Sequence, residues 1–123
     1  MEWKFTGSRP VYQQIMELLR GAVLSGEFPP GSRVPSVRDL ALSARVNPNT
    51  MQRALSELER EGILTGCGTA GRNVTQDSSV LQQLHDQAVE AAVRASAAQF
   101  RELGLTMAEA AQLLLQLDPQ KEA

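Results

Sequence analysis

Apolar residues in the first part of the chain recur at a spacing near 3.6 residues, the period of an α-helix that buries one face. In the stretch PVYQQIMELLRGAVLSGEF, which begins at Pro10, this spacing predicts a helix to about residue 25, with Gly26 as a stop signal. The next segment, FPPGSRVP, contains three prolines and cannot be helical. We therefore expect a loop after the first helix.

Two further helices follow this loop with a very short connection. Ser36 with Asp39 three residues later resembles a capping box, which predicts that the second helix begins there. Asn47 can cap a third helix and Pro48 suits its first position, and the apolar spacing continues to about residue 61. Only a tight turn fits between the two helices. This arrangement predicts a helix-turn-helix.

A β-hairpin is predicted directly after the third helix. Gly62 ends that helix, and two short extended pieces follow at 63–66 and 72–75 with a glycine-rich segment between them. A hairpin in this place is the wing of a winged helix-turn-helix. We therefore predict a mainly α fold, with a winged helix-turn-helix domain over residues 1–76.

The remainder, residues 77–123, predicts a separate helical tail. Apolar residues in steps of three and four predict a long helix from about 78 to about 103 with an apolar seam, and a second apolar stripe runs beside this seam. Thr106 and Glu109 form a capping box for a last helix that ends before a proline. The tail is thus expected to be a two-helix appendage.

This appendage is expected to dimerise. A helix that is apolar on two sides is normally packed between neighbours, and one short helix cannot cover both stripes. A second copy of the chain, related by two-fold symmetry, is the usual solution. The residues predicted to make the dimer interface are Leu81, Leu84, Ala88, Ala91, Ala95, Phe100, Leu114 and Leu117.

Composition narrows the possible functions. The chain has 123 residues, of which 42% are hydrophobic, and contains no apolar run long enough for a transmembrane helix. The N-terminus lacks the order of a signal peptide, so the expected location is cytoplasmic. One Cys and one His exclude an internal disulfide and a cysteine-rich zinc site. No nucleophile–base pair is visible, and we predict neither enzyme activity nor a cofactor or metal.

Charge is unevenly distributed along the chain. The net charge is −2, but residues 1–75 hold nine Lys and Arg against seven Asp and Glu, whereas residues 76–123 hold three against seven. Residues 30–54 contain four Arg and one Asp. A local basic face on the first domain is therefore compatible with an acidic whole, because charge acts over about 10 Å in salt solution.

The polar face of the third helix is unusual. Asn49, Gln52, Arg53 and Ser56 line its first turns, where Lys and Glu would be more typical of a solvated surface. Asn, Gln and Arg are the side chains whose paired donors and acceptors match base edges in the major groove. The pattern indicates either a solvated face or a DNA-reading face.

The order of these elements resembles a known family. The segments PVYQQI, GEFPPGSRVPSVRDLA and VNPNTMQRALSELEREGIL resemble the DNA-binding domain of the GntR family of bacterial transcription regulators over residues 10 to about 75. The short two-helix tail is similar to the YtrA-like subfamily, whose members dimerise through this tail and lack a large effector domain. The resemblance implies binding to double-stranded DNA.

The resemblance also assigns roles to individual residues. Arg38 matches an arginine that contacts DNA, Ser36 a position that meets phosphate, and Gly71 a glycine of the wing. The wing departs from the family pattern, since Ala70 replaces the usual lysine and Asn73 the usual aromatic residue. The full set of predicted DNA-binding residues is Arg33, Ser36, Arg38, Asn47, Asn49, Thr50, Gln52, Arg53, Gly71 and Arg72.

Several residues have two interpretations. Arg45, in the turn, either contacts DNA or is a solubilising charge, and Tyr12 either touches the DNA backbone or packs against its neighbours. For His85 with Asp86, packing or solvent exposure is favoured over a pH-sensing or metal role. For Cys67, an inert thiol is favoured over a redox switch.

The expected function is a dimeric repressor that binds an inverted-repeat operator. The alternative is a winged-helix adaptor that binds another protein and makes no specific DNA contact. The tail, with Phe100 as its one aromatic residue, is not expected to enclose an effector pocket, and a small ligand at the dimer interface stays open as an alternative. The operator, the regulated genes and the effector do not follow from the sequence.

Overall fold

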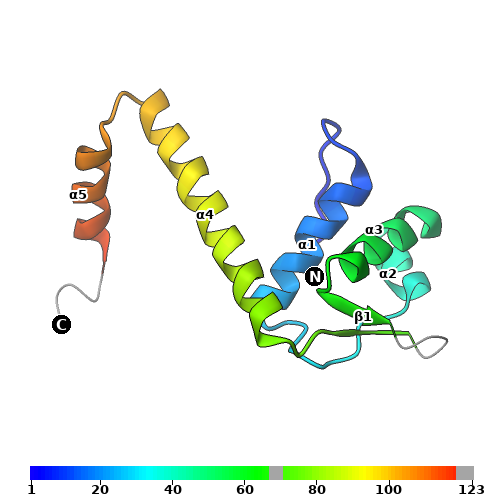
Figure 1. The fold of residues 1–123 in the computed structure, drawn as a ribbon. Helices are drawn as coiled ribbons and strands as arrows, with labels where there is room; N and C mark the ends of the chain where they lie inside the picture. Colours follow the sequence, from blue (N-terminus) through cyan, green and yellow to red (C-terminus); the bar gives the residue numbers. More distant parts are fainter. Residues whose placement is uncertain (67–70, 119–123) are drawn as a thin grey trace. The chain divides into compact units, whose positions relative to one another are not determined.

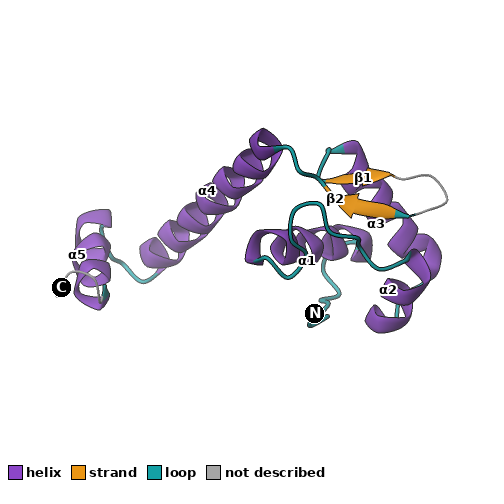
Figure 2. Ribbon diagram, turned by 90° about the horizontal axis from the view of Figure 1, so that it is seen from below, coloured by secondary structure: helices purple, strands orange, loops and turns teal. Residues whose placement is uncertain are grey.

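The computed structural model describes residues 1–66 and 71–118 of the chain (Figures 1 and 2). The predictions for Cys67 and Ala70 lie outside the described residues. The element order is α1 (Val11–Ser25), α2 (Val37–Ala44), α3 (Pro48–Arg60), β1 (Leu64–Gly66), β2 (Arg72–Val74), α4 (Ser78–Glu102) and α5 (Met107–Leu117). The predicted mainly α fold with a small hairpin is confirmed.

The chain divides into two compact units, the first ending at His85 and the second beginning at Asp86. The predicted domain division at residues 76 and 77 falls earlier, between β2 and α4. The difference arises because the first turns of α4 pack on the first unit, where Leu84 belongs to the core and Val80 and Leu81 pack against it.

Local capping explains where the helices begin. The Ser36 hydroxyl accepts a hydrogen bond from the Asp39 backbone N–H at 3.1 Å, and the Asn47 side-chain oxygen accepts from the Asn49 N–H at 2.8 Å. Each cap satisfies a backbone donor that has no partner within its helix. Both predicted helix starts are confirmed.

The core of the first unit is formed where α1 and α2 pack on α3 (Figure 2). Met51 and Leu55 of α3 and Ile15 of α1 are at most 1% exposed. Because Met51 and Leu55 are spaced at the helical period, they bury one face of α3 and leave the opposite face in solvent. Burial of one face therefore fixes which side chains the other face presents.

The two strands of the wing pair in antiparallel register, with Leu64 opposite Val74 and Gly66 opposite Arg72. The loop predicted before α2 also takes part in this sheet. Its Val34 N–H donates to the Arg72 carbonyl at 2.9 Å, and the Val74 N–H donates to the Ser32 carbonyl at 2.8 Å. The prolines exclude a helix here, as expected, but the segment pairs with the open edge of β2.

The N-terminal segment before α1 is held by a buried side chain. Gln14 is 4% exposed, and its amide nitrogen donates to the carbonyls of Thr6 and Arg9 at 2.9 Å each. Its amide oxygen accepts from the Thr6 N–H at 2.8 Å. These three bonds fold the segment back along α1, and the sequence pattern gave no indication of them.

In the second unit, the later turns of α4 are followed by α5, whose start carries the predicted capping box. The Thr106 hydroxyl accepts from the Glu109 N–H at 3.1 Å, and the Glu109 carboxylate accepts from the Thr106 N–H at 3.0 Å. Ala110 of α5 is 3% exposed. Leu103, Leu114 and Leu117 are 75%, 51% and 78% exposed.

One predicted part of the dimer interface needs correction. Leu84 was expected in the seam that faces a second copy, but it is 5% exposed and lies in the core of the first unit. Leu81 packs partly buried against the same core. The seam spacing at the start of α4 serves folding of the winged domain, because its first apolar residues meet that domain.

Candidate nucleic-acid interface

The outer face of α3 presents polar side chains at its N-terminal half. Asn49, Gln52 and Arg53 are all exposed, and Thr50 is half-buried. The Gln52 amide nitrogen donates to the Ser56 hydroxyl at 3.0 Å, which fixes the Gln52 side chain along the helix. Its second amide hydrogen and its amide oxygen stay available to a base edge.

Ion pairing separates the arginines of the first unit into two groups. Arg9 pairs with Glu17 and Arg20 with Glu61, each with N–O distances of 2.7 Å. Within residues 1–66 and 71–118, Arg33, Arg38 and Arg45 form no ion pair, and all three are exposed. Unneutralised arginines therefore occur in the loop before α2, in α2 and in the turn before α3.

Arg53 is also free of carboxylate partners, but its guanidinium has a fixed neighbour. Its Cζ atom lies 3.8 Å from the centroid of the Tyr12 ring, within the range of a cation–π contact. Tyr12 is half-buried and packs against the core. The packing interpretation of Tyr12 is therefore confirmed, and the sequence pattern did not reveal its contact with Arg53.

A hollow of about 500 Å³ lies between the start of α2 and the wing, lined by residues that include Arg33, Ser36 and Gly71. Asp39 lines it as well. Gly71 has φ +99°, and a Cβ atom there would lie 3.3 Å from the Arg33 Nη2 atom. The guanidinium of Arg33 thus lies against Gly71. A side chain at this position would be strained by the positive φ and would require the guanidinium to shift slightly.

The predicted contact of Arg72 with DNA stays a prediction, and the structure gives this side chain an ion-pair partner. As the wing residue left to supply positive charge, it was predicted to contact DNA. Its Nε atom instead donates to a Glu59 carboxylate oxygen at 2.9 Å, and its side chain is 18% exposed. The pair joins β2 to α3 and neutralises the charge, so Arg72 anchors the wing.

Arg45 adopts a backbone conformation that is rare for its residue type. Its φ and ψ are 58° and 46°, in the left-handed region, and its N–H closes the end of α2 on the carbonyls of Ala41 and Leu42. This conformation costs a residue with a Cβ about 1–2 kcal/mol. The sequence could not have indicated it, because glycine is the usual residue in such a turn.

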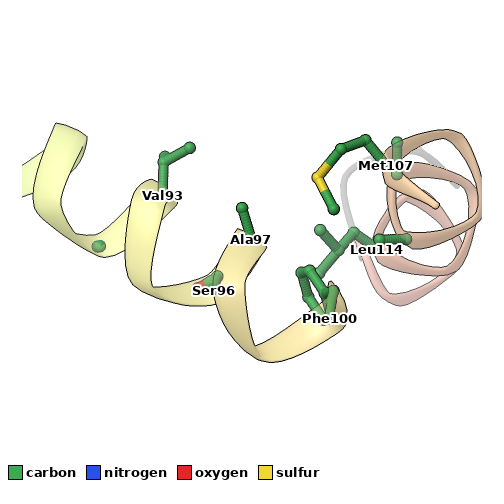
Figure 3. A pocket seen from close by; sticks show the side chains of 9 residues that line it. Val93, Ser96, Ala97, Phe100, Met107 and Leu114 are labelled. Carbon is green, nitrogen blue, oxygen red and sulfur yellow. The ribbon is translucent and has the colours of Figure 1, made fainter. Parts of the chain in front are cut away.

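The tail carries an apolar groove of about 360 Å³ between the later part of α4 and α5 (Figure 3). Val93, Ala97 and Phe100 of α4 face Met107 and Leu114 of α5 across it. The groove is open along one side. The volume of this groove falls within the range of small-molecule sites, and the expectation that the tail encloses no effector pocket stays a prediction.

His85 and Asp86 are both exposed on α4. Among the described residues, no group of three or more His, Cys, Asp or Glu side chains is placed to hold a metal ion. In the same part of the chain, no helix has the length and apolar character needed to span a membrane.

Comparison with known proteins places this arrangement in a family. The model of the bacterial regulatory proteins of the gntR family matches residues 11–71. The uncharacterised helix-turn-helix transcriptional regulator YhcF of Bacillus subtilis is 35% identical over 109 residues, which cover 89% of this chain and 90% of YhcF. The chain belongs to the GntR family.

Two further relatives agree with this assignment. The transcriptional repressor YtrA of Bacillus subtilis is 39% identical over 71 residues, covering 58% of this chain and 55% of YtrA. A solved GntR family transcriptional regulator from Listeria monocytogenes has a TM-score of 0.83 at 27% identity, covering 93% of this chain and all of that one. The similarity to YtrA-type regulators inferred from the short tail is confirmed.

The GntR-family chain is therefore a transcriptional regulator with a DNA-binding domain. Its relatives are named as regulators and not as enzymes, which confirms the prediction against catalysis. The family match covers α1, α2, α3 and the start of the wing, so the exposed face of α3 and the unneutralised arginines lie within the matched region.

Proposed function

We propose that the protein is a dimeric repressor that binds an inverted-repeat operator through its winged domain. The observation that carries this proposal is the contrast in ion pairing. Among the described residues, Arg33, Arg38, Arg45 and Arg53 have no carboxylate partner, whereas the other arginines of the first unit are paired. Leaving several like charges unneutralised on one domain favours a polyanionic ligand.

In this proposal the residues divide by task. Arg33 and Arg38 contact phosphates, together with backbone N–H groups at the start of α2 near Ser36. Asn49, Gln52 and Arg53 on α3 enter the major groove, where paired donors and acceptors distinguish bases. The proposed interface consists of Arg33, Ser36, Arg38, Asn47, Asn49, Thr50, Gln52, Arg53 and Gly71.

Dimerisation is proposed to use the tail. Phe100 and Leu114 line an open apolar groove, and Leu117 is 78% exposed. Exposed apolar surface of this kind is costly in water and is normally covered by a partner. A two-fold dimer would present two α3 helices to two half-sites, which accounts for an inverted repeat. Its seam is formed by Ala88, Ala91, Ala95, Phe100, Leu114 and Leu117.

Repression is proposed because occupation of a promoter by a bound dimer blocks transcription without further machinery. Similarity to YtrA, which is named a repressor, supports this choice. No effector is required by the proposal. The cellular location that follows from binding to bacterial DNA is the cytoplasm.

The test is fluorescence-anisotropy binding to DNA from the protein's own promoter region, with scrambled DNA as competitor and at two salt concentrations. Specific binding that survives the competitor supports the proposal. Equal, weak binding to both DNAs that moderate salt abolishes contradicts it and favours the adaptor alternative. The salt dependence reports how many phosphates the protein neutralises.

A matched pair of variants sharpens this test. Arg38→Ala is expected to weaken binding and to reduce the slope of log K against log salt by about 1, because one phosphate contact is lost. Arg9→Ala is the control, since Arg9 is exposed but paired with Glu17 at 2.7 Å. An unchanged slope for Arg38→Ala would contradict its phosphate role.

A further inference from the structure

An aromatic ring from α1 contacts Arg53, an exposed arginine in the N-terminal half of α3. Arg53 is exposed, and its Cζ atom lies 3.8 Å from the centre of the Tyr12 ring. The ring itself cannot move far, because Tyr12 is half-buried and packs against the core. The contact joins the first turn of α1 to the polar face of α3.

The usual partner for Arg53 on its own helix is already engaged. Glu57 lies four residues later, the spacing at which an arginine and a glutamate pair along a helix. Its carboxylate is instead 3.4 Å from Arg60. Arg53 therefore keeps its full positive charge, although a carboxylate lies one turn away on the same helix.

Stacking and ion pairing use different parts of a guanidinium. Its five N–H donors point outward in the plane of the group, whereas a cation–π contact uses the face. An ion pair would occupy the donors and cancel the charge. The ring of Tyr12 restricts the side chain but leaves the N–H edge of Arg53 available to a phosphate or a guanine.

Restriction before binding also reduces the entropy lost on binding. A long arginine side chain has many rotamers, and ordering it at an interface opposes association. In this protein part of the ordering is complete in the free state, because the guanidinium already rests on the ring. Arg53 thus reaches its partner with both its charge and its orientation preserved.

We infer that Tyr12 is a positioning residue for DNA binding, which holds the Arg53 guanidinium in the orientation in which it meets DNA. This inference rests on the proposed DNA-binding function of the α3 face. The role belongs to the aromatic ring of Tyr12 and not to its hydroxyl. It assigns a part in recognition to α1, outside the helix-turn-helix.

The inference is tested by a double-mutant cycle on own-promoter DNA, using Tyr12→Leu, Arg53→Met, the double variant and Tyr12→Phe. We expect Tyr12→Leu to weaken binding about two- to fivefold, the size of an exposed cation–π contact. Tyr12→Phe keeps the ring and should bind like the wild type. In the Arg53→Met background, Tyr12→Leu should have no further effect.

Two measurements distinguish positioning from a purely structural role. The salt slope of Tyr12→Leu should equal that of the wild type, because no charge is removed. In the free protein, the NMR signal of the Arg53 Nε–H group should show a ring-current shift in the wild type and in Tyr12→Phe, and lose it in Tyr12→Leu. The melting temperature of each variant checks folding, and Tyr12→Met replaces Tyr12→Leu if the latter does not fold.

Several outcomes would overturn the inference. They are equal losses from Tyr12→Leu in both backgrounds, a loss in Tyr12→Phe as large as in Tyr12→Leu, or the absence of a ring-current shift in the wild type. Wild-type binding that does not distinguish own-promoter from scrambled DNA would instead refute the proposed function, and the inference with it. The wild-type titration thus separates the two failures.

Discussion

The two units of this chain manage apolar surface in opposite ways. The winged unit closes a core of its own: Met51, Leu55 and Leu58 of α3 are at most 1% exposed, and the first turns of α4 complete the same core. The tail unit does not, since Leu114 and Leu117 are more than half exposed. A unit with a closed core can fold alone, whereas the tail has a surface that a partner would cover.

The two units also differ in how their charged side chains are paired and balanced. In the winged unit, Arg33, Arg38 and Arg45 are exposed without ion pairs among the described residues. In the described part of the tail, Arg94 pairs with Glu90 at 3.0 Å and Arg101 has no ion pair. The tail is nonetheless acidic, since residues 76–123 hold three Lys and Arg against seven Asp and Glu. The unneutralised positive charge of the first unit supports its proposed contact with DNA, and the exposed apolar surface of the second supports its proposed self-association.

The largest expected effect comes from opening the closed core. Leu55→Ala should lower the free energy of unfolding by about 2–5 kcal/mol, because a buried leucine is replaced by a cavity. Leu42→Ala is the matched control: Leu42 is 71% exposed in the same unit, and its loss should cost less than about 0.5 kcal/mol. Urea denaturation measures both. Equal costs would contradict the description of the core.

A charge placed in the tail groove tests the open unit. Leu114→Asp should raise the dimer dissociation constant by roughly 100-fold or more, since a carboxylate would be buried without a partner. Sedimentation equilibrium measures the constant. Leu42→Asp makes the same change at an exposed leucine of the winged unit and should leave self-association unaltered. A dimer unaffected by Leu114→Asp would exclude the groove as the interface.

Arg45 combines a positive charge with a left-handed backbone conformation, and two substitutions separate the effects of the two. Arg45→Asn should raise the free energy of unfolding by up to about 1 kcal/mol, because asparagine adopts this conformation more readily. Arg45→Ala retains the strain and should not stabilise. Thermal unfolding compares the two variants.

DNA binding by the same two Arg45 variants decides between the two interpretations of this residue. If Arg45 contacts a phosphate, both variants lower the salt slope by about 1. If it is a solubilising charge, the slope stays at the wild-type value in both.

The smallest effect concerns the start of α5. The Thr106 backbone N–H and hydroxyl hold the pKa of the Glu109 carboxyl below its usual range, because they bind the charged form. Because the pKa of Glu109 is lower in the folded protein than in the unfolded chain, this interaction raises the free energy of unfolding at pH values above the unfolded-state pKa. The contribution is lost as the pH falls through the folded-state pKa. Amide shifts of Thr106 and Glu109 followed by NMR should therefore change only below the usual glutamate range. Glu109→Gln should remove this change, and its persistence in that variant would contradict the assignment.

Much of the fold could be predicted from local signals. Ser36, Asn47 and Thr106 each mark a helix start to the residue, because a cap acts within three positions of its own side chain. The wing strands also lie within one residue of their predicted bounds. The polar face of α3 could be predicted as well, since its residues occupy the positions between the apolar residues that recur at the helical period.

The candidate site was predicted less completely. Residue type singled out Gln52 and Arg53, and the family resemblance singled out Arg38, but Arg72 was treated as an equivalent charge. The ion pair between Arg72 and Glu59 and the stacking of Arg53 on Tyr12 join positions far apart in the chain. No periodicity along one helix reports such neighbours.

The sequence by itself determined the helices, their caps, the hairpin and the family to which they belong, because these depend on side chains within a few residues of one another. The tertiary structure alone decided that Leu84 serves the winged core, that Arg72 is neutralised and that Arg33 lies against Gly71. Each depends on contacts between segments brought together only when α1, α2 and the wing pack around α3. Burial and pairing are properties of that packing, whereas helix boundaries are properties of the local chain.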